Sequence, residues 1–175
     1  MNKKYFITLI LIFLLNDNPS SSHGPSRQKV SETIEINAKP MEVWKIVSDF
    51  NNFKWNSDIK QISSNGNEVG SERIIEFNSS KKIKQKLEKV DSNKKMVNWR
   101  VIETDNTILP VNSYAAKVFV KEKDGKTQVL YKSGFYRGFM GNDPPPELND
   151  ETSKRLVKEF VVNNLKGLKN IIENN

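Results

Sequence analysis

Few side chains in this chain of 175 residues have the chemistry that a catalytic centre requires. The sequence contains one histidine, His23, and no cysteine. A serine nucleophile needs a base beside it, and His23 precedes every predicted strand, so it is poorly placed to act as that base. A single histidine with a neighbouring amine also supplies too few ligands for a copper site. The sequence therefore predicts a protein that is not an enzyme, with no metal site and no cofactor.

Arg73 is the charged residue best suited to binding a ligand. It shares one side of a predicted strand with Phe77, and a guanidinium on the inner face of a sheet could hold a carboxylate. An ion pair within the protein, with Glu76, Glu88 or Glu103, explains Arg73 equally well. The sequence leaves both explanations open.

A second polar residue, Asn164, interrupts an apolar helix face. Residues 150–172 have helical periodicity, and Asn164 lies near the middle of the apolar arc that also includes Phe160. A buried amide without a partner costs about 1–3 kcal/mol. Asn164 must therefore bond to a sheet side chain, to water or to a ligand in a cavity.

The elements that position these residues are mostly strands. A first strand begins near Val30, and Pro40 opens a helix that ends near Phe50, followed by a second short helical turn or loop through Trp55. Asp124–Gly125 predicts a tight hairpin. Further strands are predicted at residues 58–63, 71–77, 81–90, 96–103, 111–122 and 127–136.

Short loops between successive strands require antiparallel pairing. The order therefore predicts an α+β fold, in which a curved antiparallel sheet of six to seven strands wraps around one long C-terminal helix, with two short helices after the first strand. Trp99, Tyr131 and Phe135 fall on sides of their strands that mix aromatic and polar residues. This mixture suits a ligand pocket, although a filled core with a few bonded polar groups is the alternative.

The N-terminus has the layout of a secretory signal peptide. Two lysines precede an apolar run at residues 6–15, which is too short to span a bilayer stably. Ser20 and Ser22 occupy the −3 and −1 positions of a cut before His23. An uncleaved anchor is the alternative. We expect export to the periplasm, no membrane attachment after cleavage, and three parts: the signal peptide 1–22, an N-terminal arm 23–29 and a domain 30–175.

The chain carries a formal net charge of +7, which favours acidic partners. Its densest basic cluster consists of Lys81, Lys82, Lys84 and Lys86. These lysines could dock an acidic protein, or they could guard an exposed edge strand against pairing with another chain. No nucleic-acid motif occurs, so nucleic acid is not an expected partner.

A proline-rich bridge connects the last strand to the long helix. Three consecutive prolines hold it extended, and Arg137 and Asp143 are expected to project charge beside Pro144 and Pro145. The bridge could be a second contact for a protein partner. Alternatively, it is a rigid connector that sets the angle of the helix.

Several segments resemble the START-like, Bet v 1-type superfamily, also called SRPBCC or polyketide cyclase/dehydratase and lipid transport. The matching residues are IEINAKPMEVW (34–44), Asp49–Phe50, Trp55, GSER (70–73) and the spacing of Leu87 and Asp91. A narrower resemblance joins HGPSRQKV (23–30), LPVNSY (109–114) and FYRGFMGNDPPPELND (135–150) to the MxaD family of periplasmic accessory proteins. The narrower resemblance covers almost all of the chain after residue 22.

The resemblance implies a helix-grip fold with Tyr114 among the family positions of its interior. It also implies an accessory role in methanol oxidation, in which the protein promotes contact between methanol dehydrogenase and its cytochrome c acceptor. The wider superfamily implies an alternative, which is binding or transport of a small hydrophobic or amphipathic ligand. A cyclase- or dehydratase-like enzyme is a further variant of that alternative.

Overall fold

The computed structural model describes residues 24–53 and 55–174. The expected signal peptide, its cleavage site and His23 lie outside the described residues. The elements in chain order are β1 (Gln28–Ile36), α1 (Pro40–Val47), β2 (Ile59–Ser64), β3 (Glu72–Phe77), β4 (Lys82–Asp91), β5 (Met96–Glu103), β6 (Val111–Lys123), β7 (Lys126–Arg137), the 3-10 turn η1 (Pro146–Leu148) and α2 (Asp150–Glu173).

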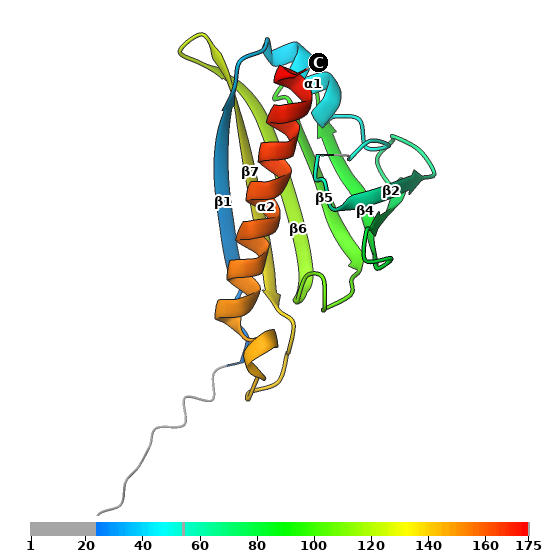
Figure 1. Cartoon of the computed structure of the whole chain (residues 1–175), viewed down its shortest axis with the longest axis vertical. Coiled ribbons are helices and arrows are strands. Elements are labelled where there is room, and N and C mark those ends of the chain that lie inside the picture. The colour runs from blue at the N-terminus through cyan, green and yellow to red at the C-terminus, as the bar shows by residue number, and fades with distance from the viewer. Residues whose placement is uncertain (1–23, 54, 175) are drawn as a thin grey trace, which may run out of the picture.

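The seven strands form one antiparallel sheet in the order β1-β7-β6-β5-β4-β3-β2. Figure 1 shows α2 running along one face of this curved sheet, where it packs mainly on β1 and β7. The predicted α+β helix-grip architecture is confirmed. One short helix, α1, follows β1, and a turn-rich segment that buries Phe53 and Trp55 stands where a second short helix was expected.

The long helix has a defined start and a buried face. The Asn149 side chain caps its N-terminus by accepting a hydrogen bond from the Thr152 amide at 2.8 Å, and two acidic residues in the first turn favour the helix dipole. Its buried face consists of Ser153, Val157, Val161, Asn164, Leu165 and Leu168. No helix in the part of the chain that the structure describes is both long and apolar enough to cross a membrane.

The lysine-rich strand β4 lies inside the sheet, between β3 and β5. The strands at the two edges are β1 and β2. The prediction that the lysines of residues 81–86 guard an exposed edge is therefore wrong. The sequence pattern correctly identified a strand there. The position of a strand in the sheet depends on which strands it pairs with, and the residues of a single strand do not specify those partners.

Candidate functional site

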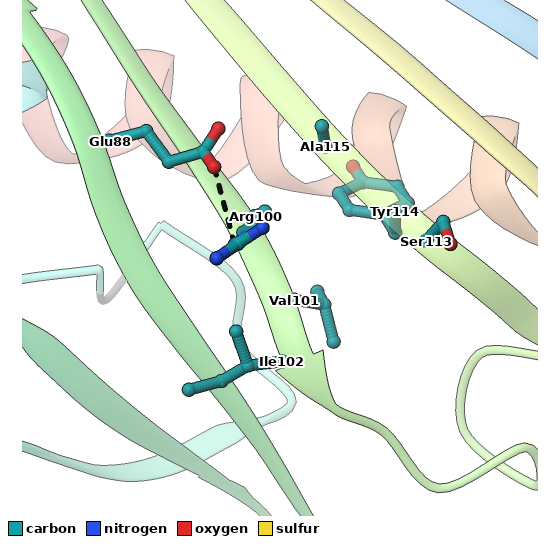
Figure 2. Close-up of a pocket in the computed structure, with 7 residues that line it drawn as sticks. All are labelled: Glu88, Arg100, Val101, Ile102, Ser113, Tyr114 and Ala115. Carbon is teal, nitrogen blue, oxygen red and sulfur yellow. Dashed lines mark ion pairs between the residues drawn. The ribbon is translucent and has the colours of Figure 1, made fainter.

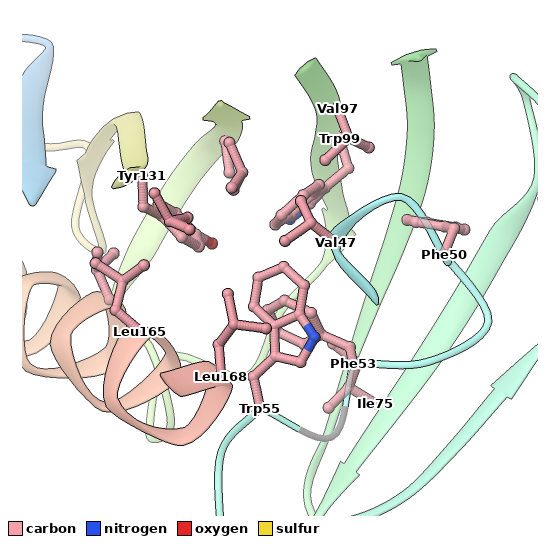
Figure 3. Close-up of a cluster of buried hydrophobic side chains, with 14 of the residues drawn as sticks. Val47, Phe50, Phe53, Trp55, Ile75, Val97, Trp99, Tyr131, Leu165 and Leu168 are labelled. Carbon is pink, nitrogen blue, oxygen red and sulfur yellow. The ribbon is translucent and has the colours of Figure 1, made fainter. Parts of the chain in front are cut away.

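The interior between the sheet and α2 collects the residues predicted for a cavity. Of these eight residues, seven are buried and Phe160 is half-buried. The buried seven are Arg73, Phe77, Trp99, Tyr114, Tyr131, Phe135 and Asn164. Trp99 lies edge-on to Tyr131 with ring centroids 5.8 Å apart, and Tyr114 stacks with Phe135 at 6.2 Å. Figure 3 shows Trp99 and Tyr131 on the strands facing Leu165 and Leu168 of α2, with Trp55 and Phe53 beside them.

Arg73 is buried, and no carboxylate among the described residues forms an ion pair with it. Its Nε donates to the Gln85 side-chain oxygen at 2.9 Å, and its Nη1 donates to the Phe50 carbonyl at 3.2 Å. The guanidinium carbon lies 4.1 Å and 4.2 Å from the ring centroids of Phe50 and Phe53. Aromatic faces attract a cation, so these rings partly replace the lost hydration. Burial lowers the pKa of Arg73 to about 9, and the nearby Tyr131 and Asp49 oppose this shift.

The predicted ion pair between Arg73 and a glutamate does not form. Glu76 pairs with Lys60 and Lys82, and Glu88 pairs with Arg100. Glu103 lies 3.7 Å from Lys84. Arg73 instead lies on the buried side of β3 with Ile75 and Phe77. The alternation of β3 puts Arg73 and Glu76 on opposite sides, so this ion pair was excluded by geometry.

Two tyrosines extend the polar interior beyond Arg73. The Tyr114 and Tyr131 hydroxyl oxygens lie 3.1 Å apart. Burial raises the pKa of Tyr114 to about 12, although the hydroxyls of Tyr131 and Ser133 lower it. Burial also raises the pKa of Tyr131 well above its usual value, and the neighbouring Tyr114 adds to that shift. Both phenols therefore keep their protons at neutral pH and act as hydrogen-bonding groups rather than as bases.

Several buried polar atoms have no hydrogen-bond partner among the described residues. They are Nη2 of Arg73, the indole Nε1 of Trp55 and of Trp99, Oγ of Ser133, and both amide atoms of Asn164. A hydrogen bond from Asn164 to a sheet side chain, one of the three alternatives, is absent from the described part of the chain. Buried polar atoms in folded proteins are nearly always bonded, so these atoms are candidates for contacting a ligand or ordered water.

Sequence reasoning missed two residues of this interior. Gln85 lies on the inward side of β4, between Ile83 and Leu87, and the alternation of that strand could have identified it. Trp55 matched the family pattern, but its irregular segment gave no periodicity from which to infer burial. Among the described residues, the buried polar and charged side chains include no carboxylate, and no group of histidine, cysteine and acidic residues could hold a metal.

A pocket of about 490 Å³ opens between β5 and β6. The pairing of β5 with β6 ends at Arg100 and Ala115. Just before Ala115, the register of β6 with β7 is interrupted around Ser113, whose φ angle is positive at 50°. Figure 2 shows the Arg100–Glu88 ion pair on one side of this pocket and Tyr114 on the other. The Arg100 Nε and the Glu88 carboxylate oxygen are 3.2 Å apart. Tyr114 therefore lines the pocket and also bonds to Tyr131 in the interior.

The predicted lysine cluster is largely neutralised by carboxylates. Lys84 lies 2.8 Å from Glu72, and Lys82 lies 3.4 Å from Glu76. The hydrogen bond from Lys84 lowers the pKa of Glu72. Lys81 bonds to Thr107, and Lys86 stands opposite Glu72 in the register. Fewer unpaired positive charges are therefore available to an acidic partner at this cluster than its four lysines would predict.

Arg137 does not project from the proline-rich bridge, as had been expected. Its side chain is buried, forms a 2.9 Å ion pair with Asp150, and donates to the carbonyls of Phe139 and Gly141 at 2.8 Å and 2.6 Å. Asp143 is exposed, whereas Pro144 and Pro145 are half-buried. The arginine therefore anchors the bridge internally instead of offering its charge to a partner.

The family model for polyketide cyclase / dehydrase and lipid transport matches residues 27–173. No curated protein matches the sequence. Among solved structures, the chain is similar to an uncharacterized protein from Bacillus thuringiensis, with a TM-score of 0.68, 22% identity and coverage of 83% of this chain and 98% of that one. It is similar to XoxI from Bacillus cereus, with a TM-score of 0.67, 20% identity and coverage of 82% and 94%.

Truncated norcoclaurine synthase from Thalictrum flavum has a TM-score of 0.63 and 13% identity, with coverage of 87% of this chain and 98% of that one. At these identities the similar structures establish the fold alone. The family match extends from the start of β1 to the end of α2 and so includes the whole helix-grip architecture. This chain belongs to the polyketide cyclase / dehydrase and lipid transport family.

Proposed function

We propose that this protein is an exported, non-catalytic accessory protein of methanol oxidation, which promotes contact between methanol dehydrogenase and its cytochrome c acceptor. The periplasmic location rests on the signal-like sequence of residues 1–22. The accessory role rests on the MxaD-like segments 109–114 and 135–150. The interior groups Arg73, Tyr114 and Tyr131 hold their protons at neutral pH, so none of them is ready to act as a general base.

The observation that carries this proposal is that the two MxaD-like segments meet in space. The Asn112 side chain donates to the carbonyls of Arg137 and Gly138 at 2.9 Å and 2.8 Å. The Ser153 hydroxyl donates to the Pro110 carbonyl at 2.6 Å. Segments with no catalytic group therefore build one fixed surface, which suits a contact with another protein.

This surface presents apolar side chains to solvent. Phe139 is 38% exposed and Met140 is 51% exposed. The Phe139 ring packs so closely on Gly141 that a Cβ there would lie 2.5 Å from it. The Phe139 ring therefore lies over Gly141, where any larger residue would meet it. Exposed aromatic and methionine side chains often dominate the binding energy of protein interfaces.

We expect the double substitution Phe139→Ala and Met140→Ala to weaken binding to purified methanol dehydrogenase or cytochrome c by about tenfold or more. The melting temperature should change little, because both side chains are exposed. Surface plasmon resonance with each partner measures the effect. Met41→Ala is the matched control, because Met41 is an exposed methionine on α1 with 54% exposure.

A pull-down from the periplasm of methanol-grown cells tests the function itself. Recovery of the dehydrogenase, the cytochrome or both by the wild-type chain supports the proposal. Recovery of neither protein, from cells that contain both, counts against it. Equal binding by the wild-type and Phe139/Met140 variants would leave the function standing but would exclude this contact surface.

A second candidate function is binding of a small amphipathic ligand in the interior. The specific observation in its favour is the set of unpartnered buried atoms on Arg73, Trp55, Trp99 and Asn164. A ligand with an apolar body and a hydrogen-bonding or anionic end would fill that environment. A cyclase-like reaction would require a general base, which the protonated tyrosines do not supply.

For this second function, we expect native mass spectrometry of the exported wild-type protein to show a bound small molecule that denaturation releases. Asn164→Leu should lower its occupancy severalfold while raising the melting temperature of the ligand-free protein, because it removes two unpartnered polar atoms. Asn163→Leu is the control, since Asn163 is the exposed neighbour on the same helix. A ligand-free wild-type protein, or equal occupancy in both variants, would contradict this function.

A further inference from the structure

The face of the sheet opposite α2 carries lysines that do not stand out in the sequence. Because α2 covers one face (Figure 1), the alternate residues of each strand point to the other face. Lys29 of β1, Lys132 of β7, and Lys117 and Lys121 of β6 point to that other face, and all four are exposed. We refer to these four residues as the outer lysine face.

The register brings two of these lysines directly opposite each other. Lys117 pairs with Lys132 across β6 and β7, although the two residues are 15 positions apart in the chain. The ammonium groups of Lys121 and Lys132 each lie 5.9 Å from the centroid of the Phe119 ring, so positive charge gathers around this side chain. Like charges that face each other across two strands destabilise a sheet.

No carboxylate among the described residues forms an ion pair with the outer lysine face. Two acidic side chains on this side of the sheet, Glu88 and Glu35, already have partners. Glu88 bonds to Asn98 at 2.8 Å and to Arg100 at 3.2 Å, and Glu35 lies 3.6 Å from Lys126. On β4, by contrast, glutamates of the neighbouring strands lie beside Lys82 and Lys84. The positive charges of Lys82 and Lys84, which are close in sequence, are therefore balanced by glutamates. The positive charges of the outer lysine face, which come together only in the folded sheet, are not balanced by any ion pair among the described residues.

From this difference we infer that the outer lysine face binds a carboxylate-rich surface of a partner protein. Two observations indicate this kind of partner. The positive charge of the four lysines is complementary to a carboxylate-rich surface. Phe119 and Leu130 lie half-buried between the lysines, so they suit a protein surface with acidic groups around an apolar centre. The identity of the partner as methanol dehydrogenase or its cytochrome c rests on the proposed function. The outer lysine face shares no residue with the surface that presents Phe139 and Met140.

The test compares two double substitutions of equal charge. Lys117→Gln with Lys132→Gln alters the outer lysine face, and Lys82→Gln with Lys84→Gln alters the compensated cluster. Stopped-flow association with each purified partner is measured from about 20 to 200 mM salt, a range over which screening of exposed charges becomes strong. We expect the first variant to associate about tenfold more slowly at low salt, with a flatter salt dependence, and the second to behave like wild type.

Thermal unfolding separates a binding defect from a folding defect. The Lys117/Lys132 variant should melt at the same or a higher temperature than wild type, because a like-charge pair is removed. The Lys82/Lys84 variant should melt at a lower temperature, because it loses ion pairs with Glu72 and Glu76. A Lys117/Lys132 variant that melts well below wild type would show that these lysines stabilise the fold, which would overturn the inference.

An NMR titration with a soluble poly-glutamate peptide separates this inference from the proposed function. Chemical-shift changes concentrated on Lys117, Lys121 and Lys132 support the outer lysine face even if neither methanol-oxidation protein binds, and then only the proposed function fails. Shifts spread evenly over all lysines overturn the inference. Binding to phosphatidylglycerol vesicles without binding to the peptide also overturns it. Unchanged partner association in the Lys117/Lys132 variant overturns the inference and leaves the function intact.

Discussion

Replacing Gly167 by alanine should destabilise the protein by about 2–3 kcal/mol, the upper part of the range for overpacked sites. A Cβ at Gly167 would lie 1.4 Å from the Trp55 carbonyl oxygen and 2.4 Å from its carbonyl carbon. Neither atom belongs to a movable side chain, so α2 or the segment around Trp55 must shift. At an ordinary position inside a helix, replacing glycine by alanine stabilises the protein by about 1 kcal/mol. At Gly167 we expect the opposite effect on the free energy of unfolding.

Chemical denaturation of Gly167→Ala against wild type measures this effect. Lys166→Ala is the control, because Lys166 is the exposed neighbour on α2 and should change the free energy of unfolding by no more than about 0.5 kcal/mol. A Gly167→Ala protein as stable as wild type would show that α2 does not touch the Trp55 segment. If the interior binds a ligand as proposed, the shift should also weaken that binding, because the Trp55 indole belongs to the interior.

Replacing Arg137 by methionine should cost about 2–3 kcal/mol of stability. It removes the ion pair with Asp150 and the hydrogen bonds to the carbonyls of Phe139 and Gly141. Breaking a fully buried ion pair typically costs about 3–5 kcal/mol. A smaller loss is expected here because the Asp150 side chain is 35% exposed. Partner binding should also fall, because the chain around Phe139 loses its anchor.

The matched control for this substitution is Arg155→Met. Arg155 forms a 3.0 Å ion pair with Glu159 on α2, but both side chains are more than half exposed. Exposed pairs of this kind contribute about 0.3–0.5 kcal/mol. Denaturation curves of the two variants should therefore differ clearly. Equal stability of the two would mean that Arg137 does not hold the bridge. A binding defect in the Arg137 variant alone would link the anchored surface to the partner.

Local patterns in the sequence were sufficient to predict most of the fold. The alternation of apolar residues identified the strands, because a strand with one buried face must repeat every two residues. Asp124–Gly125 predicted the hairpin between β6 and β7, where both residues have positive φ angles of 52° and 75°. The helical arc around Asn164 predicted its burial. These features depend on residues close together in the chain.

The partners of charged side chains could not be predicted in the same way. Lys84 could be assigned to Glu72 only after the register between β3 and β4 was known, because a shift of one residue moves a side chain to the other face. Arg137 resembled an exposed charge beside prolines, yet its environment is set by Asp150 and by two carbonyls. Burial of a charge depends on which groups surround it in space.

The sequence by itself determined the strand pattern and the long amphipathic helix, since these follow from short-range periodicity. Only the tertiary structure decided that Arg73 bonds to Gln85 and the Phe50 carbonyl and that Lys117 faces Lys132. The physical reason is that electrostatic and hydrogen-bonding energies depend on distances of a few ångströms between residues that are far apart in the chain. Strand order and register set those distances.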